Sequence, residues 1–224
     1  MLSEQPIAAL LVLAGLSLLP FAFVVATSFV KISVVLSILR NGLGTGQVPS
    51  GTVITGLSLI LTLYVMTPVG EAMAEAAAPA ASRVDPTAPA GPDELTALRE
   101  AFDAGKEPLR AFLARHAGDR EQELFVDLAR RTRAPDRRAD VAAEDFLVVL
   151  PAFLVSELSE AFQIGFLVFL PFLVIDMVVA NVLLALGMHM LSPTTVSLPF
   201  KLLLFVLVDG WTLLARGLVL GYAV

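Results

Sequence analysis

Met188, His189 and Met190 place two thioethers and an imidazole side by side in the stretch ALGMHMLSP, residues 185–193, where a short turn would ordinarily carry polar residues and glycine. Thioether and imidazole groups are ligands that Cu(I) accepts in proteins. Adjacent residues of a turn rarely converge on one ion, so a metal site is the weakest interpretation, and a turn that simply packs is the plainer one. The spacing alone leaves these alternatives open.

No other group of side chains has the types and spacing of a catalytic or cofactor site. The chain has no cysteine, which removes thiolate metal ligands and disulfides. Neither His189 nor His116, which we expect on a surface helix, has an identifiable nucleophile beside it. The sequence therefore predicts a protein that is not an enzyme and holds no cofactor and no metal.

The other notable side chains are charged residues within apolar segments. Inserting each such charge into a membrane costs at least ~2.5 kcal/mol on insertion scales, so each one needs a partner or a water-filled cavity. After Glu4, these segments hold matched numbers of bases and acids, which predicts a charge network: Lys31, Arg40, Lys201 and Arg216 with Glu157, Glu160, Asp176 and Asp209.

Residues equally far from the turn of an antiparallel hairpin lie level with each other. Both Asp176 with Lys201 and Glu160 with Arg216 are centred on Met188, so we expect the first pair to meet about 18 Å from the tip, at ~1.5 Å per residue. The second pair is the weaker prediction because a proline intervenes. Chance spacing with snorkelling side chains is the alternative.

These charges lie in a chain of 224 residues that is 57% hydrophobic, with a mean hydropathy of +0.82, which is too apolar for an ordinary soluble domain. The uncharged runs approach the roughly 20 residues that cross a bilayer. We predict four long helices, at about 7–30, 51–70, 146–186 and 196–223. Pro151 and Pro171 predict a break or kink in the third.

Residues 71–145 differ from both flanks, because they hold 11 of the 15 basic and 16 of the 21 acidic residues. An Ala/Pro tract, AAAPAASRVDPTAPAGP, leads into three predicted short amphipathic helices: one after Pro92, one from Pro108 with Leu109, Phe112 and Leu113 on one face, and one from Asp119 with a Gln122 capping box and Leu124, Phe125 and Leu128 inward. We expect a small soluble insert whose charges face water and bind no nucleic acid.

The predicted fold is all-α: a first hydrophobic helical hairpin at 1–70, the insert at 71–145, and a second hairpin at 146–224 with a loop at 187–199. Lys31, Arg40 and Lys201 lie near the two hairpin turns, so the positive-inside rule places those turns in the cytoplasm and the insert and both termini outside. The start MLSEQP lacks the basic flank of a cleavable signal peptide, so we expect the first helix to be retained.

Four stretches closely resemble the bacterial type III secretion export-gate family that includes flagellar FliP and injectisome SctR: TSFVKISVVLSILRNGLG (27–44), LTLYVMTPVG (61–70), LPFLVIDMVVANVLLALGMHMLSP (170–193) and SLPFKLLLFVLVDGWTLL (197–214). The resemblance covers both hairpins but not the insert, and is greater to the injectisome branch. It implies a subunit of an inner-membrane export gate in the secretion basal body. Five copies would join two other small membrane proteins in a conical assembly through which unfolded polypeptides pass.

The resemblance also implies a role for the second loop, which in this family carries methionines that line the narrowest point of the channel. Met188 and Met190 match those positions, whereas His189 stands where a third methionine is common. Methionine suits a gasket because its flexible side chain repacks at low cost, and apolar constrictions gate by dewetting. The hairpins would then be bent and held largely above the bilayer plane, against sister subunits and not only lipid.

Two alternatives belong to other functional classes. The first is a small transporter or channel embedded in lipid, in which Asp176 and Lys201 relay ions or protons. The second is a structural scaffold without residues facing a lumen. A transporter is expected to work alone in liposomes, whereas a gate subunit is expected to copurify with partner membrane proteins.

Overall fold

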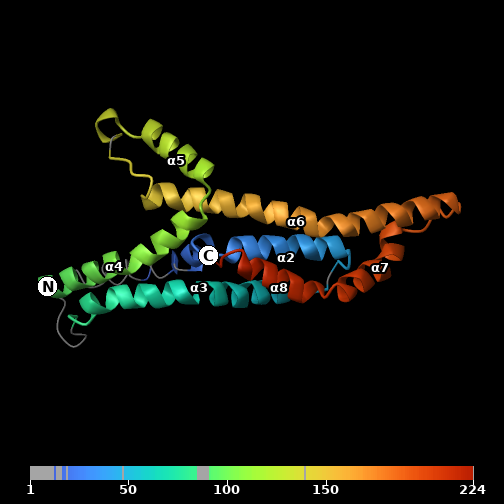
Figure 1. The fold of residues 1–224 in the computed structure, drawn as a ribbon, viewed down its shortest axis with the longest axis horizontal. Helices are drawn as coiled ribbons and strands as arrows, with labels where there is room; N and C mark the ends of the chain where they lie inside the picture. The colour runs from blue at the N-terminus through green and yellow to red at the C-terminus, as the bar shows by residue number, and fades with distance from the viewer. Residues whose placement is uncertain are drawn as a thin grey trace.

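Long helices lie side by side in an elongated, all-helical arrangement in the computed structural model (Figure 1). The structure describes residues 13, 17–18, 20–46, 48–84, 91–138 and 140–223. Among these residues there is no strand, which confirms the predicted fold class. The helices are α2 (Phe29–Leu43), α3 (Gly51–Ala81), α4 (Pro92–His116), α5 (Asp119–Thr132), the 3-10 turn η1 (Pro135–Arg137), α6 (Phe146–Ala185), α7 (Pro193–Leu207) and α8 (Gly210–Leu220).

The first hairpin is formed by α2 and α3, and its first helix differs from the prediction of 7–30. Residues 20–25 are helical, 26–28 leave the helix, and α2 begins at Phe29. The Thr27 hydroxyl donates to the Phe23 carbonyl at 2.6 Å and accepts from the Phe29 amide, so side-chain bonds compete with the backbone ladder. The remainder of the predicted helix falls largely outside the described residues.

The predicted helix at 51–70 is too short, because α3 continues to Ala81 through Pro68 and Pro79. The first residues of the Ala/Pro tract are therefore helical. Their small side chains let α4 lie close along this end of α3, with Gly105 beside Ala77. Alanine also has the highest intrinsic helix propensity, so this packing and local preference act together.

Past the end of α3, the described part of the insert contains two α-helices, α4 and α5, where three were predicted. Gly105 and Pro108 lie inside α4, which packs along α3 instead of breaking. Leu113 and Phe112 are buried as expected. In α5, however, no residue is fully buried. The predicted inward face holds only for Phe125, which is half-buried and packs against the cluster around Leu113, whereas Leu124 and Leu128 are exposed.

The predicted capping box at the start of α5 is also absent. The N-cap of the helix is Gly118, and the Gln122 side chain instead donates to the carbonyls of Ala114 and Ala117, both at 2.9 Å. Gln122 thus satisfies free carbonyls at the end of α4. One side chain thereby holds the corner between α4 and α5.

The second hairpin is formed by α6, α7 and α8. Helix α6 is continuous over 40 residues, so the predicted break at its prolines is absent; a proline can bend a helix without ending it. The predicted helix 196–223 is instead divided, because α7 and α8 meet at an angle of 59°. Asp209 at this bend has a left-handed backbone (φ 49°), and the Phe205 ring packs edge-on against Trp211.

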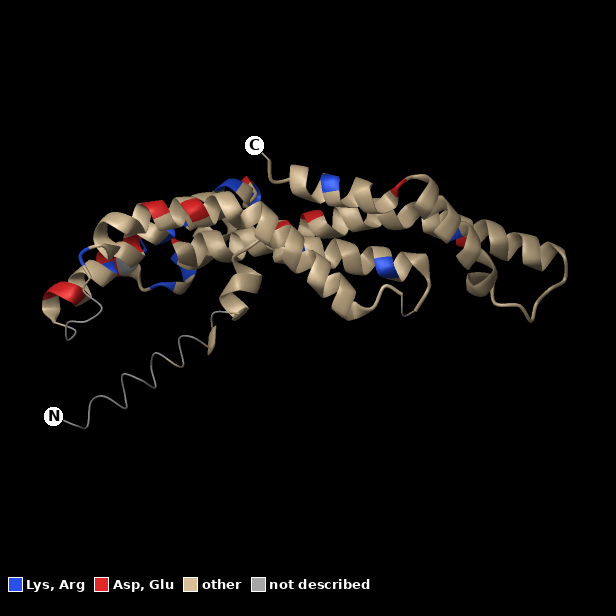
Figure 2. Cartoon of the chain, turned by 90° about the horizontal axis from the view of Figure 1, so that it is seen from below, with Lys and Arg blue, Asp and Glu red and all other residues tan. Residues whose placement is uncertain are grey.

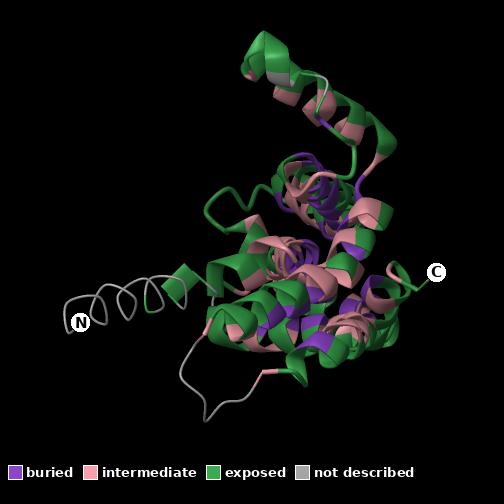
Figure 3. Cartoon of the chain, turned by 90° about the vertical axis from the view of Figure 1, so that its left-hand side faces the viewer, coloured by how far each residue is buried: buried purple, intermediate pink, exposed green. Residues whose placement is uncertain are grey.

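The core of the described residues is divided into two clusters. Figure 3 shows the buried residues lying between packed helices and exposed residues on the outer faces. One cluster lies where α2 packs on α6 and includes Ile32, Val35 and Leu39. The other joins the end of α4 to the start of α6 through Leu113, Val149 and Phe153. Many large apolar side chains on the outer faces of α3, α6, α7 and α8 remain exposed.

Candidate functional site

The methionine loop, residues 186–192, projects from the far end of the second hairpin. Helix α6 ends in a tight turn at Gly187 (φ 70°), where the Met188 amide donates to the Leu183 carbonyl at 2.9 Å. Met190 is fully exposed, and Met188 and His189 are exposed as well. The predicted loop of 187–199 is shorter in the structure, because α7 already begins at Pro193.

Within the described part of the chain, the side chains of Met188, His189 and Met190 form no hydrogen bond or ion pair with another residue. Among the described residues there is no group of three His, Cys, Asp or Glu side chains able to hold a metal ion. Large apolar surface at the tip is unfavourable in water, so it requires lipid, another subunit or a partner. A pore gasket formed by Met188, His189 and Met190 remains a prediction.

The ion pair predicted between Asp176 and Lys201 is present. Lys201 Nζ lies 2.6 Å from Asp176 Oδ2, although only 2% of the lysine side chain is exposed. The Ser197 hydroxyl donates to the second Asp176 oxygen, and Lys201 also donates to the Gly42 carbonyl at 3.0 Å. The level arrangement of α6 and α7 thus brings these charges together, as the hairpin geometry indicated.

The predicted partner for Glu160 is wrong. Lys31, from the first hairpin, lies 2.7 Å from Glu160 Oε2 and 2.9 Å from Glu157 Oε1. Glu157 has a side-chain exposure of 0%, whereas that of Glu160 is 53%. Helix α2 packs along α6, so a lysine on α2 is nearer to Glu160 than Arg216 on α8.

The other members of the predicted network are not brought together with these pairs. Arg216 and Asp209 are exposed, and within the described part of the chain neither forms an ion pair. Arg40 is half-buried and donates to the Gly46 carbonyl at 3.2 Å, closing the turn of the first hairpin. The eight charges thus form two separate sites, with three members outside both.

The sequence-based reasoning missed Tyr222. Its hydroxyl donates to Glu157 Oε2, and Lys31 Nζ lies 4.2 Å from the centre of its ring, a cation–π contact. A phenol near the end of an apolar helix is an indication that a buried polar partner exists. Nothing in the spacing indicated which carboxylate it would reach.

His116 is also placed differently from the expected surface position. Its ring is half-buried, with ring centres 4.5 Å from Phe112 and 5.1 Å from Tyr222. Burial, followed by the positive charge of Lys31, lowers the pKa of His116 despite the bond between Nδ1 and the Phe112 carbonyl. The C-terminal end of α4 therefore packs directly against the charge site formed by Lys31, Glu157 and Glu160.

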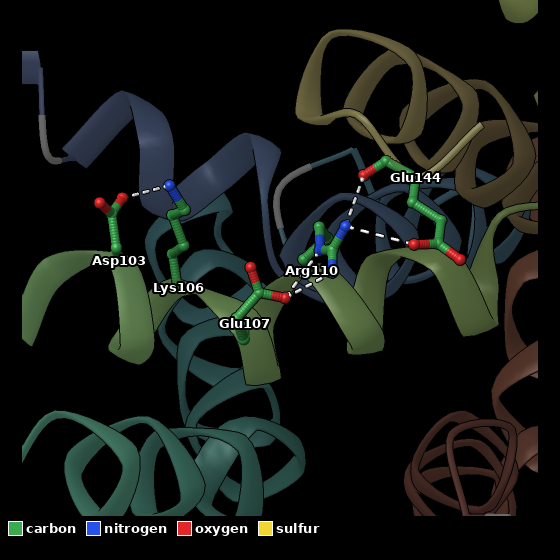
Figure 4. Close-up of polar contacts among 5 residues, drawn as sticks. All are labelled: Asp103, Lys106, Glu107, Arg110 and Glu144. Carbon is green, nitrogen blue, oxygen red and sulfur yellow. Dashed lines mark hydrogen bonds and ion pairs between the residues drawn. The ribbon is translucent and has the colours of Figure 1, made fainter. Parts of the chain in front are cut away.

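Several charges of the insert form ion pairs with one another, and Figure 2 shows the charged residues gathered mainly at one end of the molecule. On α4, Arg110 bonds Glu107 at 2.6 Å and reaches the Glu144 carboxylate and carbonyl, both at 3.4 Å (Figure 4). Asp103 pairs with Lys106 one turn earlier (Figure 4). Such exposed pairs contribute little to stability, and they fit the predicted solvated face.

Among the residues that the structure describes, two helices are long and apolar enough to cross a membrane by length and composition, α3 and α6. The bent pair of α7 and α8 gives a third if it counts as one span. The charge sites lie along these helices, with Glu157 and Asp176 both on α6.

Sequence comparison agrees with this architecture. The model of the FliP family matches residues 12–218. The chain is 50% identical to the Yop proteins translocation protein R of Yersinia pestis, over 95% of this chain and 94% of that protein. It is 45% identical to the hypersensitivity response secretion protein HrcR of Ralstonia nicotianae (96% and 97%) and 40% identical to the flagellar biosynthetic protein FliP of Bacillus subtilis (95% and 90%).

These helices, with their buried charges and apolar surface, are those of an α-helical inner-membrane protein. The chain belongs to the FliP family, and relatives named for translocation and hypersensitivity secretion stand among its most similar proteins. The family resemblance inferred from the four sequence stretches is confirmed, including its tendency toward the injectisome branch.

Proposed function

We propose that this chain is a core subunit of a type III secretion export gate, the passage through which unfolded proteins cross the inner membrane. The observation that carries this proposal is the methionine loop: an exposed Met188–His189–Met190 tip on an apolar hairpin, in a chain similar over nearly its full length to secretion and translocation proteins. The role is mechanical, with no catalytic group and no cofactor.

The exposed apolar faces support assembly with other chains. Side chains such as Phe166, Leu203 and Val206 are well exposed on α6 and α7. A hydrophobic patch of this extent marks an interface or a lipid contact. We infer a homo-oligomer, with five copies by resemblance, completed by two other small gate proteins and by lipid at the rim.

Within that assembly the methionine loops of neighbouring copies converge on the axis. A ring of thioethers seals against ions and small solutes, yet repacks around a passing polypeptide. His189 is a polar residue in this loop, and it either turns away from the lumen or makes the seal slightly leakier than methionine would. The hairpin turns face the cytoplasm and the insert at 71–145 faces outward, by the distribution of basic residues.

The test is to coexpress the chain with its two neighbouring gate proteins, extract them gently and measure the mass and shape of the product. A conical multimer that crosslinks from position 188 to a stalled exported protein is expected. Replacing Met188 and Met190 with alanine should raise ion leak without preventing assembly. A chain that stays solitary and transports a solute in liposomes would instead support the transporter hypothesis.

A further inference from the structure

The charge site between the hairpins carries more negative than positive charge. One ammonium group, that of Lys31, faces two carboxylates, those of Glu157 at 2.9 Å and Glu160 at 2.7 Å. The Glu157 side chain is fully buried, whereas 53% of the Glu160 side chain is exposed. The surplus negative charge therefore reaches the outer face of α6 at Glu160, where an apolar surrounding makes a further partner favourable.

Arg216 on α8 has the opposite surplus. It is exposed, and nowhere in the described part of the chain does it form an ion pair. Its neighbours on the same helical face, Leu213 and Leu220, are exposed and apolar, and a Cβ at Gly217 would meet nothing within 4 Å. Helix α8 thus presents a cation on an open, apolar face that another helix can approach.

Glu160 lies on a similar face of α6. One and two turns further along this face, Gln163 and Leu167 are both exposed. A guanidinium has several donors in one plane, so it can bond the Glu160 carboxylate and the Gln163 carbonyl oxygen together. The face of α6 around Glu160 therefore complements the face of α8 around Arg216 in both charge and polarity.

The two charges also lie at similar heights along the molecule. Glu160 and Arg216 are equally far along the chain from Met188, at the tip of the second hairpin. Copies related by rotation about an axis along the hairpins keep such residues level. Asp209 is a poorer partner for Arg216, because it is nearer to the tip and lies at the N-terminal end of α8, where the helix dipole already favours a negative charge.

We propose that Arg216 of one copy binds Glu160 of the neighbouring copy, so that each subunit neutralises the surplus charge of the next. This rests on the homo-oligomer of the gate function proposed above, and it specifies the surfaces by which the copies meet. Because these surfaces differ, the contact is head-to-tail and can close into a ring. In the separate chain Arg216 has no carboxylate to lose, so its contribution arises only on assembly.

The first test is cross-linking in membranes that contain the complete gate, with the chain coexpressed with its two neighbouring gate proteins. The chain has no cysteine, so Glu160→Cys/Arg216→Cys supplies its only two thiols. A short bismaleimide is expected to join these copies into a ladder that extends beyond the dimer. Phe162→Cys/Arg216→Cys is the matched control: Phe162 is also exposed, but residues two apart on a helix face different directions, so no ladder is expected.

Charge variants decide the question if the cysteine variant assembles poorly. Glu160→Gln leaves the pair of Lys31 with Glu157 in place, and Arg216→Met keeps an apolar stem. Each single variant should lower, several-fold, the fraction of assembled gate that survives a stronger detergent, because it leaves the opposite charge unpaired at the interface. The double variant Glu160→Gln/Arg216→Met should lose no more than the worse single one, since both changes remove the same interaction.

The outcomes separate this contact from the gate function. A chain that forms no multimer with its neighbours would refute the homo-oligomer itself. A multimer of wild-type mass in which thiols at 160 and 216 join only within one chain, stop at the dimer or fail to react would refute this contact alone. Additive losses in the double variant, or equal survival of all variants, would refute it too; equal survival would mean that water or lipid headgroups solvate Arg216.

Discussion

Replacement of Lys31 by methionine tests the charge site between the hairpins most directly. The change keeps the apolar stem but leaves Glu157, whose side chain is fully buried, without its cation. Glu160 is half exposed and can be solvated, so the penalty falls on Glu157 alone. Removing one partner of a buried pair costs about 3–5 kcal/mol. For a chain of this size that corresponds to a melting temperature lower by roughly 10 °C.

The measurement is thermal unfolding of the purified protein in a mild detergent, followed by helical circular dichroism. The double variant Lys31→Met/Glu157→Gln carries neither charge, and we expect it to recover most of the lost stability. Arg216→Met removes an exposed cation and should change stability by less than about 0.5 kcal/mol. Equal losses in the single and double variants would show that packing, and not the uncompensated carboxylate, dominates.

Three further predictions concern the surroundings of this site and the bend of the last helix. Tyr222→Phe removes a hydrogen bond to a buried carboxylate and should cost about 1.5–3 kcal/mol in the same unfolding assay; an unchanged midpoint would contradict the bond. Because the folded-state pKa of His116 is lowered, its protonation opposes folding. Stability should therefore fall as pH drops below the unfolded value near ~6.5, and His116→Gln should flatten this part of the stability profile. If both proteins respond to pH alike, His116 is not responsible. Gly210→Ala places a Cβ 2.2 Å from the Phe205 ring and should cost about 1–3 kcal/mol, whereas Gly217→Ala, in open space, should be tolerated; equal midpoints would contradict the close packing at the bend.

The helical class and the contact of Asp176 with Lys201 could be predicted because both follow from local periodicity. A hairpin imposes a fixed register, so equal distance along the chain from the turn becomes proximity in space. The ends of the helices could not be predicted in the same way. Gly105 and Pro108 suggest a helix boundary, but packing of α4 on α3 overrides that preference.

Contacts between distant segments were beyond the sequence for a different reason. The apolar segments offer four acids as possible partners of Lys31, and only the packing of α2 on α6 selects Glu157 and Glu160. The proximity of His116 to Tyr222 depends on how the insert returns to the hairpins, which no periodicity describes. The proposed role of the methionine loop involves contacts with other chains, so it remains a prediction.

Helix α6 has 40 residues and is therefore about 60 Å long, roughly twice the hydrocarbon thickness of a bilayer. A lone copy surrounded by lipid would have to tilt steeply, deform the membrane or leave apolar turns in water, each at a cost per ångström of mismatch. That cost falls when the apolar surfaces of several copies pack against one another and the assembly extends beyond the lipid. The length of α6 thus disfavours separate subunits dispersed in lipid. A thicker host membrane should therefore slow the association of subunits.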